Sequence, residues 1–476
     1  MNDPLGLLPF ALASGGGTIN GMPAEQAVAA GVTLLQRCAP LVRALAGRRA
    51  AILLPNGSAF LTAFAATEGR AAVLINPLAS PPEIAHQLSD GDVGAVLTIS
   101  SLASGVPAHI LRVELDDLPR SARVITDGRV REVDLGSHFA FRLEGEIGAE
   151  GRDEEAVVVY TSAMAGTAAG AILTHRNLLA NARAAVEQAR FTSADKVLAP
   201  LPWSHLFGLV VTAAAPLLAG AAVLAPGRFS PPDALGLLEE GGVTVVAGVP
   251  SIFRSLLATL DRRPEALRAP ALRLCICGGA PLEEELQARW YEATGVELRQ
   301  GYGLTEAGPI SLFNTLDQPN HRGTLGLPFP GVEVTIRDQD TGRQCADGVE
   351  GEICIRGDNV SPGYVGGDSG LSKREGWLRS GDLGVRASDG YFTFRGLIKR
   401  MFTRDGYNIY PAELERVIGQ LDGVRSVRVS AVQSDRREND IRVEVGGDVT
   451  EEVIREWCAS QLAAYKQPEE VVVSSG

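Results

Sequence analysis

The chain has 476 residues, more than one hydrophobic core usually covers, so we expect two or more domains. Hydrophobic residues make up 45% and charged residues 21%, as in an ordinary soluble globular protein. The 44 basic and 57 acidic residues give a net charge of −13, which argues against nucleic acid as the main partner.

The six cysteines are scattered along the chain. Cys275 and Cys277 share one strand face, but no second pair stands at the spacing of a zinc site. We therefore expect reduced, mostly buried thiols in a cytoplasmic protein. The six histidines are equally dispersed, so a histidine-based metal site is not expected.

No basic region followed by a long apolar core stands at the N-terminus, so no signal peptide is predicted. Residues 206–226 carry no charge and are nearly long enough to span a bilayer. Their alanine content, together with Pro216 and Gly220, favours a buried helix, a turn and a strand at 221–224. We therefore predict no transmembrane segment.

Apolar strand-like runs alternate with helical patterns through most of the chain. This alternation predicts stacked βαβ units and mostly parallel sheets, an α/β fold. The predicted strands are 50–54, 72–75, 95–99, 156–160, 243–247 and 272–277, with helices at 58–68 and 81–89.

From about residue 332 the pattern changes to short β runs, which predict a β-rich subdomain. They lie at 332–337, 351–356 and 391–395, separated by turn signals. After Lys399 we expect a compact α+β unit with helices at 412–421 and 451–464 and strands at 424–432, 441–445 and 470–473. The predicted domains are 1–398, large and N-terminal, and 399–476, small, mobile and apparently truncated.

Residues 160–177 read YTSAMAGTAAGAILTHRN, a small-residue loop between a strand-like run and a helix-like run. Such a loop can present backbone N–H groups and a helix N-terminus to a phosphate. The loop contains no lysine, however, and Arg176 lies well beyond it.

Several segments, in order and at plausible spacing, together resemble the adenylate-forming superfamily of acyl- and aryl-CoA ligases, luciferases and adenylation domains. The resemblance covers nearly the whole chain. Its most specific motif is QGYGLTEAG at 300–308. The other segments are AILLPNGSAF at 51–60, INPL at 75–78, PLPWSHLFGL at 200–209, GGAPL at 278–282, WLRSGDLG at 377–384 and GYNIYPAELE at 406–415.

The resemblance implies a reaction in which a carboxylate is joined to the α-phosphate of ATP, with pyrophosphate as the product. Two anions must meet, so the site needs positioning, cations and oriented donors. It also implies binding of ATP or AMP and of Mg²⁺. The residues that it assigns to the nucleotide are Thr161, Ser162, Gly166, Gly278, Gly279, Ala280, Pro281, Gln300, Gly301, Tyr302, Gly303, Asp382 and Arg395.

Thr305 and Glu306 are the candidate catalytic residues of the QGYGLTEAG motif. Thr305 offers a hydroxyl to a phosphate, and Glu306 is a hard oxygen ligand suited to Mg²⁺. Seen alone, the motif could equally be a glycine turn with a solvated glutamate. Asp382 can accept hydrogen bonds from the ribose hydroxyls, or it can serve as a turn or cap residue.

By resemblance, His205, Phe207 and Ala307 line the acyl pocket, although a lone histidine is more often a satisfied, half-buried side chain. Residues 249–254 are a further pocket candidate. The apolar surroundings favour a fatty or aromatic carboxylic acid. The thiol acceptor would enter near Gly406 and would be coenzyme A or the phosphopantetheine of a carrier protein. A homodimer is compatible with the resemblance.

Lys399 stands at the predicted junction between the domains. In the resembled family the small domain rotates about this position, one arrangement forming the adenylate and the other admitting the thiol. The alternative is an exposed basic pair, Lys399 and Arg400, in a linker.

The sequence departs from the family at three cations. Ala169 stands where the lysine of the phosphate loop is usual, and Met164 and Ala165 replace hydroxyl donors. Leu397 replaces an arginine near the hinge; Arg395, two residues earlier on the same strand face, is a displaced substitute by roughly 6–7 Å. The third cation, a lysine after residues 464–468, does not follow in this chain.

Each of these cations would contribute roughly 1.5–3 kcal/mol of charge-assisted stabilisation. Even after discounting, their loss predicts adenylation slower by roughly three orders of magnitude or more. Three hypotheses stay open. The first is an acid–thiol ligase that works through an acyl-adenylate. The second is a pseudoenzyme or nucleotide- or adenylate-binding protein. The third is a ligase-fold enzyme of altered chemistry, in which a thiol or an amine takes the acyl group from a preformed adenylate and AMP leaves.

Overall fold

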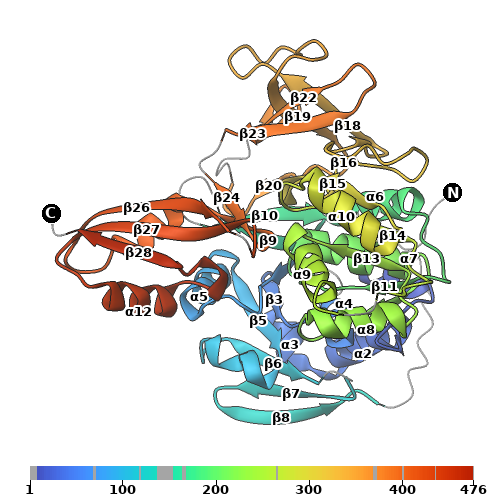
Figure 1. Ribbon diagram of the computed structural model, residues 1–476. Helices are drawn as coiled ribbons and strands as arrows, with labels where there is room; N and C mark the ends of the chain where they lie inside the picture. Colours follow the sequence, from blue (N-terminus) through green and yellow to red (C-terminus); the bar gives the residue numbers. More distant parts are fainter. Residues whose placement is uncertain are drawn as a thin grey trace.

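The computed structural model describes residues 8–67, 71–116, 119–136, 154–162, 168–263, 266–367, 373–398, 401–434 and 436–474, except for the side chain of Ser162. Within these residues the chain forms two sheets of nine strands, one of five, one of three and a two-stranded hairpin. Figure 1 shows a large body of sheets and helices, from which the C-terminal strands project as a separate lobe.

The first large sheet is parallel through its centre, from β15 to β1, and antiparallel at both edges. The parallel centre confirms the predicted βαβ construction. The strand order is β17 (Leu327–Pro328), β16 (Leu312–Phe313), β15 (Leu298–Tyr302), β14 (Leu274–Cys277), β13 (Val245–Gly248), β11 (Lys196–Leu198), β12 (Ala222–Leu224), β1 (Thr18–Ile19) and β2 (Met22–Pro23).

The second large sheet is parallel from β9 through β6, with antiparallel strands added on both sides. The hairpin β7–β8 was not predicted from the sequence, because its outer face is largely exposed and lacks a continuous apolar run. The strand order is β20 (Gly363–Tyr364), β10 (Ala168–Thr174), β9 (Glu155–Ser162), β4 (Ala72–Leu74), β3 (Arg49–Leu53), β5 (Val93–Thr98), β6 (Leu111–Leu115), β7 (Ser121–Thr126) and β8 (Arg129–Asp134).

The helices pack on and between these sheets. All nine residues of α4 (Ser58–Ala66) are buried, and its core cluster contains residues of both large sheets, so this helix lies in the layer between them. The other helices of the large body are α1 (Leu8–Ser14), α2 (Ala24–Arg37), α3 (Ala39–Ala44), α5 (Pro81–Asp90), α6 (His175–Gln188), α7 (Ala215–Leu218), α8 (Pro231–Glu239), α9 (Pro250–Leu260) and α10 (Glu284–Thr294).

The uncharged segment 206–226 forms a π-helical turn (η3, Gly208–Ala214), the short helix α7 and strand β12, as predicted. Its first two elements are almost completely buried in the protein. In the part of the chain that the structure describes, no helix is long and apolar enough to cross a membrane.

The β-rich region forms the five-stranded sheet. It consists of β18 (Val332–Arg337), β19 (Gly351–Gly357), β22 (Trp377–Arg386), β21 (Lys373–Arg374) and β23 (Phe392–Leu397). Asp382 was expected just after a turn, but it lies inside the ten-residue strand β22. Gly381 has φ +77°, and the pairing of β22 shifts register nearby, so the small residues accommodate a bulge in the strand.

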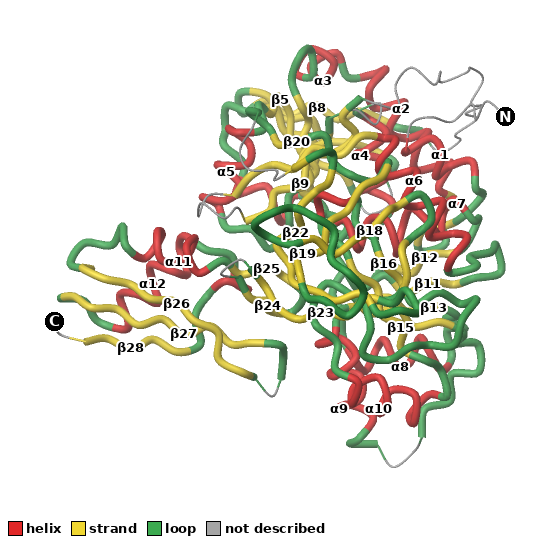
Figure 2. Tube along the Cα trace, turned by 90° about the horizontal axis from the view of Figure 1, so that it is seen from above, coloured by secondary structure: helices red, strands yellow, loops and turns green. Residues whose placement is uncertain are grey.

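The C-terminal lobe has its own hydrophobic core, built from residues between Phe402 and Val471. Figure 2 shows its sheet and helices extending away from the large body. Its elements are β24 (Phe402–Arg404), β25 (Tyr407–Ile409), α11 (Pro411–Ile418), β26 (Val424–Gln433), β27 (Asn439–Gly447), α12 (Glu451–Gln461), η5 (Ala464–Lys466) and β28 (Glu470–Ser474). The predicted boundary at Lys399 lies outside the described residues.

The small-residue loop differs in one respect from the sequence-based expectation. It joins β9 to β10, two antiparallel strands, and α6 begins only at His175. The expectation of a helix N-terminus directly behind the loop is therefore wrong, because strand β10 intervenes. Residues 163–167 of the loop, including Gly166, lie outside the described residues.

Candidate functional site

A cavity of about 450 Å³ lies where the large body meets the C-terminal lobe. It gathers most of the residues that the sequence assigned to a site. Those that line it are Thr161, His205, Phe207, Gly278, Gly279, Ala280, Pro281, Gln300, Gly301, Tyr302, Gly303, Thr305, Glu306, Asp382 and Gly406.

The parallel strands of the first sheet explain this convergence. The glycines at 278 and 279 follow β14, and Gly303 follows β15, so both segments leave the sheet at its carboxyl edge, where ligands bind in open α/β sheets. Glycine is required at two of these positions, Gly279 and Gly303. A Cβ on Gly303 would lie 1.7 Å from the carbonyl oxygen of Pro309, and Gly279 has φ +77°.

Glu306 is held from two sides. The hydroxyl of Tyr364, on β20, donates a hydrogen bond of 2.6 Å to Glu306 Oε1, and the Thr161 hydroxyl lies 3.4 Å from the same oxygen. Burial and the neighbouring carboxylate raise the pKa of Tyr364, so the phenol stays protonated and donates. Tyr364 could not be predicted from local sequence patterns, because the pairing of β20 with β10 joins segments far apart in the chain.

This donor set fits Mg²⁺, which prefers hard oxygen ligands and commonly takes only one or two carboxylates from a protein. Glu306 and Thr161 bring one carboxylate and one hydroxyl to the same point. Among the described residues no cluster of three or more His, Cys, Asp or Glu side chains could hold a metal by itself. The arrangement therefore suits a magnesium ion that a phosphate also binds.

Asp382 faces the cavity beside Tyr302, whose hydroxyl donates a 2.6 Å hydrogen bond to Asp382 Oδ2. Burial raises the pKa of Tyr302 well above its usual value, and Asp382 raises it further, so this phenol is also a donor. Leu397 lies directly opposite Asp382 in the pairing of β22 with β23 and also lines the cavity.

Two predicted residues face elsewhere. Arg395 is exposed and does not line the cavity, because Phe394 and Leu397 of the same strand face inward across a register shift between β22 and β23. Ala307 is fully buried, and its carbonyl accepts a hydrogen bond from Asn359, while Pro309 and Ile310 line the cavity instead. Lys399 and Gly166 lie outside the described residues, as does the side chain of Ser162.

His205 borders the cavity but lies deep among protein atoms. This burial lowers its pKa to about 4, so the imidazole is neutral at physiological pH. Its Nδ1 accepts the backbone N–H of Phe207 at 3.3 Å, which leaves Nε2 as the N–H group of the neutral ring. His205 can therefore donate a hydrogen bond without supplying a positive charge.

The described part of the cavity lining contains no cation. Among the described residues that line the cavity, none is Lys or Arg, while Glu306 and Asp382 carry negative charge. Arg254, a cation of the predicted acyl-pocket segment 249–254, is paired with Glu283 at 2.6 Å and is not part of the lining. Apolar side chains make up one part of the wall: Phe191, Val211, Ile276, Phe313 and Phe329.

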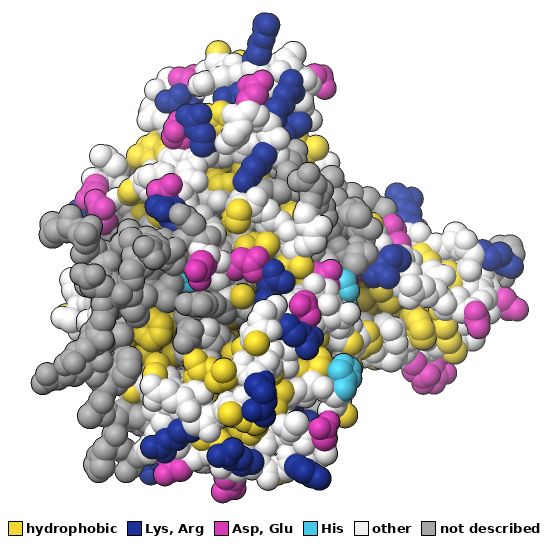
Figure 3. Space-filling model, turned by 180° about the vertical axis from the view of Figure 1, so that it is seen from behind, with side chains coloured by type: hydrophobic (Ala, Val, Ile, Leu, Met, Phe, Trp, Pro, Cys, Tyr) yellow, Lys and Arg dark blue, Asp and Glu magenta, His cyan; other side chains and the backbone are white. Residues whose placement is uncertain are grey.

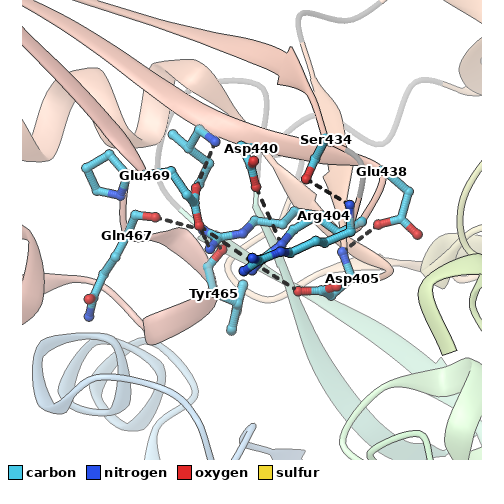
Figure 4. Close-up of polar contacts among 12 residues, drawn as sticks. Arg404, Asp405, Ser434, Glu438, Asp440, Tyr465, Gln467 and Glu469 are labelled. Carbon is cyan, nitrogen blue, oxygen red and sulfur yellow. Dashed lines mark hydrogen bonds and ion pairs between the residues drawn. The ribbon is translucent and has the colours of Figure 1, made fainter. Parts of the chain in front are cut away.

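The C-terminal lobe closes the cavity with the hairpin β24–β25. Gly406, at the tip, has φ +78°, and a Cβ added to it would lie 2.2 Å from Val249 Cγ1 of the large body. Arg404, on the same hairpin, is buried and donates to the carbonyls of Tyr465 and Gln467 at 2.9 and 2.7 Å (Figure 4). The hairpin is therefore anchored firmly to its own lobe.

Charged residues around Arg404 complete this anchor. Glu469 binds Arg404 (Figure 4). Arg437 approaches Asp405, Asp440 and Glu469. Glu438 accepts the backbone N–H of Asp405 at 2.6 Å, next to the glycine at the tip. These contacts hold the tip against the body of its own lobe.

A second cavity of about 370 Å³ lies between the same two parts of the molecule. Four residues line both cavities, so the two spaces meet at their side chains: Thr161, His205, Thr305 and Asn408. Its outer lining includes His86 and Arg416. Figure 3 shows the C-terminal lobe projecting sideways from the large body, at the right of the view.

The described cysteines form no disulfide, and five of the six are buried. Burial raises the pKa of Cys275 and of Cys354 to about 12 and that of Cys458 to about 11. These thiols are therefore unreactive side chains of the core, as the sequence predicted.

Comparisons with known proteins show which family the chain resembles. A family model described as AMP-binding enzyme matches residues 39–365. The long-chain-fatty-acid–CoA ligase of Escherichia coli O157:H7 is 29% identical over 463 residues, which cover 89% of this chain and 81% of that protein.

Two solved structures can be compared directly. A product-analogue complex of o-succinylbenzoate CoA synthetase from Bacillus subtilis is 25% identical, with a TM-score of 0.81, and covers 97% of this chain and 92% of its own. ATP-bound MatB from Rhodopseudomonas palustris is 26% identical, with a TM-score of 0.71. The match covers 100% of this chain and 95% of the MatB chain.

Proposed function

We propose a function from one premise: the chain belongs to the family of AMP-binding enzymes and is an acyl-CoA synthetase of the AMP-forming type. We infer that it joins a carboxylic acid to the α-phosphate of ATP and releases pyrophosphate. The acyl group of the resulting acyl-adenylate then passes to a thiol, and AMP leaves.

One observation carries this proposal: the candidate residues for nucleotide, acid and thiol face a single cavity. Asp382 and Glu306 line it from the large body, and Gly406 lines it from the C-terminal lobe. A reaction with three substrates needs all three held at one point, which accounts for much of the rate enhancement.

In the first half-reaction, Asp382 would accept hydrogen bonds from the ribose, and Glu306 with Thr161 would hold Mg²⁺ beside the phosphates. The ion would neutralise phosphate charge during the displacement. Thr305 would donate its hydroxyl to a phosphate. His205, neutral and with an N–H at Nε2, would donate to the carboxylate of the acid.

In the second half-reaction the thiol would enter through the second cavity. Its arm would reach the acyl carbon where Thr161, His205, Thr305 and Asn408 line both spaces. The thiol gives its proton to solvent and its sulfur attacks this carbon; the bond to the AMP oxygen breaks, and AMP leaves with the electron pair. Gly406, at the tip of the β24–β25 hairpin, lines the first cavity beside the proposed nucleotide residues, which supports the view that the lobes are arranged for this step.

We further propose that adenylation is weak. ATP with nearly four negative charges would meet Glu306 and Asp382 but no Lys or Arg among the described lining residues. Ala169, opposite Thr161, and Leu397, opposite Asp382, occupy the positions of two expected cations. The same observation favours a second candidate function, transfer of the acyl group from an adenylate that is supplied preformed.

The acid is proposed to be apolar, fatty or aromatic. The wall formed by Phe191, Val211, Ile276, Phe313 and Phe329 provides hydrophobic surface, and no cation of the described lining would bind a second carboxylate. The acceptor thiol is proposed to be coenzyme A or the phosphopantetheine of a carrier protein.

Pyrophosphate exchange with a panel of fatty, aromatic and dicarboxylic acids tests the first half-reaction. We expect slow exchange with apolar acids and none with dicarboxylates. If no acid supports exchange, but a synthetic acyl-adenylate is converted to a thioester, the second candidate function replaces the first.

A further inference from the structure

A buried ion cluster joins the C-terminal lobe to the large body. Lys466 Nζ lies 2.7 Å from Glu83 Oε1 of α5 and 2.7 Å from Glu413 Oε1 of α11. The three side chains are only 6%, 15% and 7% exposed. Glu83 belongs to the large body, while Glu413 and Lys466 belong to the lobe, so one of the two ion pairs crosses between them.

Neighbouring contacts cross at the same place. The Ser80 hydroxyl donates to the carbonyl of Gln461 at 2.8 Å. Figure 1 shows α12 beside α5, where these residues lie. Tyr465, next to Lys466, stacks on Tyr407 with ring centroids 4.0 Å apart. Tyr407 belongs to the hairpin that carries Gly406, so the cluster is coupled to the tip at the cavity.

Each side of the crossing contact keeps a partner when the contact opens. Glu83 Oε2 accepts the backbone N–H of Ser80 at 2.8 Å, as half of the capping box of α5. Lys466 keeps Glu413, which moves with it in the same lobe. Breaking the contact therefore leaves neither charge without a polar partner. The contact between lobe and body can accordingly form and break reversibly.

Lys466 stays charged in the closed arrangement. Burial favours the neutral amine, but Tyr465, Glu413 and Glu83 outweigh it and raise the pKa of Lys466. Buried ion pairs contribute little net stability but are sensitive to geometry, so they can select one arrangement among several.

We propose that Glu83 and Lys466 form a clasp that holds the C-terminal lobe in the thiol-transfer arrangement, which makes Glu83 a positioning residue for the second half-reaction. The clasp rests on the proposed function. Glu83 lines the second cavity, through which the thiol is proposed to enter, but it touches neither the nucleotide site nor the acid site. It acts through Lys466, Tyr465 and Tyr407 on the position of Gly406, so an unchanged KM for coenzyme A separates this positioning role from direct binding of the thiol.

The test uses Glu83→Gln in the full chain. The glutamine oxygen can still cap the N–H of Ser80, so α5 is kept, while its amide presents donors to Lys466 in place of a carboxylate. Glu451→Gln is the matched control, because Glu451 pairs with Arg455 inside the lobe and has no role between the two parts.

Domain arrangement is measured first, without any substrate. Spin labels on Arg129→Cys, in β8, and Glu452→Cys, in α12, both exposed, report the distance between body and lobe on a Cys345→Ser background. We expect one dominant distance in the parent and in Glu451→Gln. In Glu83→Gln the ratio of molecules at this dominant distance to molecules at all other distances should fall at least fivefold. Unchanged distances in Glu83→Gln overturn the clasp.

Half-reactions are measured second. With a preformed acyl-adenylate and coenzyme A, Glu83→Gln should lower kcat for thioester formation at least fivefold and leave KM for coenzyme A within twofold. Pyrophosphate exchange should be unchanged or faster. In a Lys466→Gln background, Glu83→Gln should lower kcat for thioester formation no further. If the losses of kcat in the two variants add, Glu83 and Lys466 do not act as a pair.

Failure of the clasp and failure of the proposed function are distinguishable. If the parent forms no thioester from any adenylate, the proposed function fails, while the spin-label distances still test the clasp. If the parent forms thioester and Glu83→Gln matches it in rate and in distance, only the clasp fails.

Discussion

The hydroxyl of Tyr364 donates a hydrogen bond of 2.6 Å to Glu306, although 58 residues separate them in the sequence. The contact joins β20, at the edge of the second large sheet, to the turn that follows β15 of the first. The carboxylate proposed to hold Mg²⁺ is therefore oriented by a residue from another sheet.

Tyr364→Phe removes this donor and keeps the ring. A hydrogen bond to a charged group contributes about 1.5–3 kcal/mol, so the carboxylate should be less well oriented. We expect the magnesium concentration for half-maximal pyrophosphate exchange to rise about tenfold, with KM for the acid unchanged. An unaltered magnesium dependence would contradict the role given to Tyr364.

Ala169→Lys and Leu397→Arg place cations opposite Thr161 and Asp382, their partners in strand pairing, where the phosphates and ribose are proposed to bind. Each should accelerate pyrophosphate exchange about tenfold, which corresponds to about 1.4 kcal/mol. Arg395→Leu is the comparison, because the exposed Arg395 does not line the cavity, and it should change the Kd of ATP less than twofold. A tenfold rise in the Kd of ATP in Arg395→Leu would show that Arg395 contacts the nucleotide, as the sequence predicted.

Gly406→Ala should impair thiol transfer more than adenylation. The new Cβ would lie 2.2 Å from Val249 Cγ1, and φ +78° disfavours a side chain, so the hairpin must shift from the cavity. We expect the thioester rate from preformed adenylate to fall at least tenfold, while pyrophosphate exchange changes less than threefold. Equal losses in both assays would mean that the tip does not distinguish the two steps.

The buried His205 should make the free energy of unfolding depend on pH. Its pKa is about 4 in the folded protein, against 6.5 ordinarily, so the unfolded chain binds more protons between these values. The free energy of unfolding should therefore rise with pH from about 4 to 6.5, by at most about 3 kcal/mol from this residue, and level off above. Denaturant titrations at a series of pH values give the free energy of unfolding. Its change with pH should differ between the parent and His205→Gln within this window only.

An NMR titration checks the same residue directly. The imidazole signals of His205 should stay in the neutral position from pH 8 to pH 5. A midpoint near 6.5 would show that the ring is not sequestered by the fold.

Much of the fold follows from local patterns. Strand β18 matches its predicted range, and α5 is marked by Ser80 and Glu83, the two residues of its capping box. The parallel sheets follow from the alternation of apolar runs and helices. Short-range periodicity therefore explains the large body and the core of the C-terminal lobe.

The candidate site was predictable in its glycines and motif residues but less so in its contacts. Tyr364 reaches Glu306 through strand pairing between distant segments, for which the sequence has no signal. Arg395 was misplaced because strict two-residue alternation fails at the register shift of β23. Lys466 was noted only as part of a C-terminal segment, since its partner Glu83 is 383 residues away.

The central claim, an AMP-forming acid–thiol ligase, is tested most directly by product analysis. The protein is incubated with ATP, Mg²⁺, coenzyme A and each acid of an apolar panel, and acyl-CoA, AMP and ADP are quantified together. We predict acyl-CoA and AMP in equal amounts with at least one fatty or aromatic acid, formed slowly, and faster acyl-CoA formation from the preformed acyl-adenylate. No thioester from either route, or ADP in place of AMP, would contradict the account.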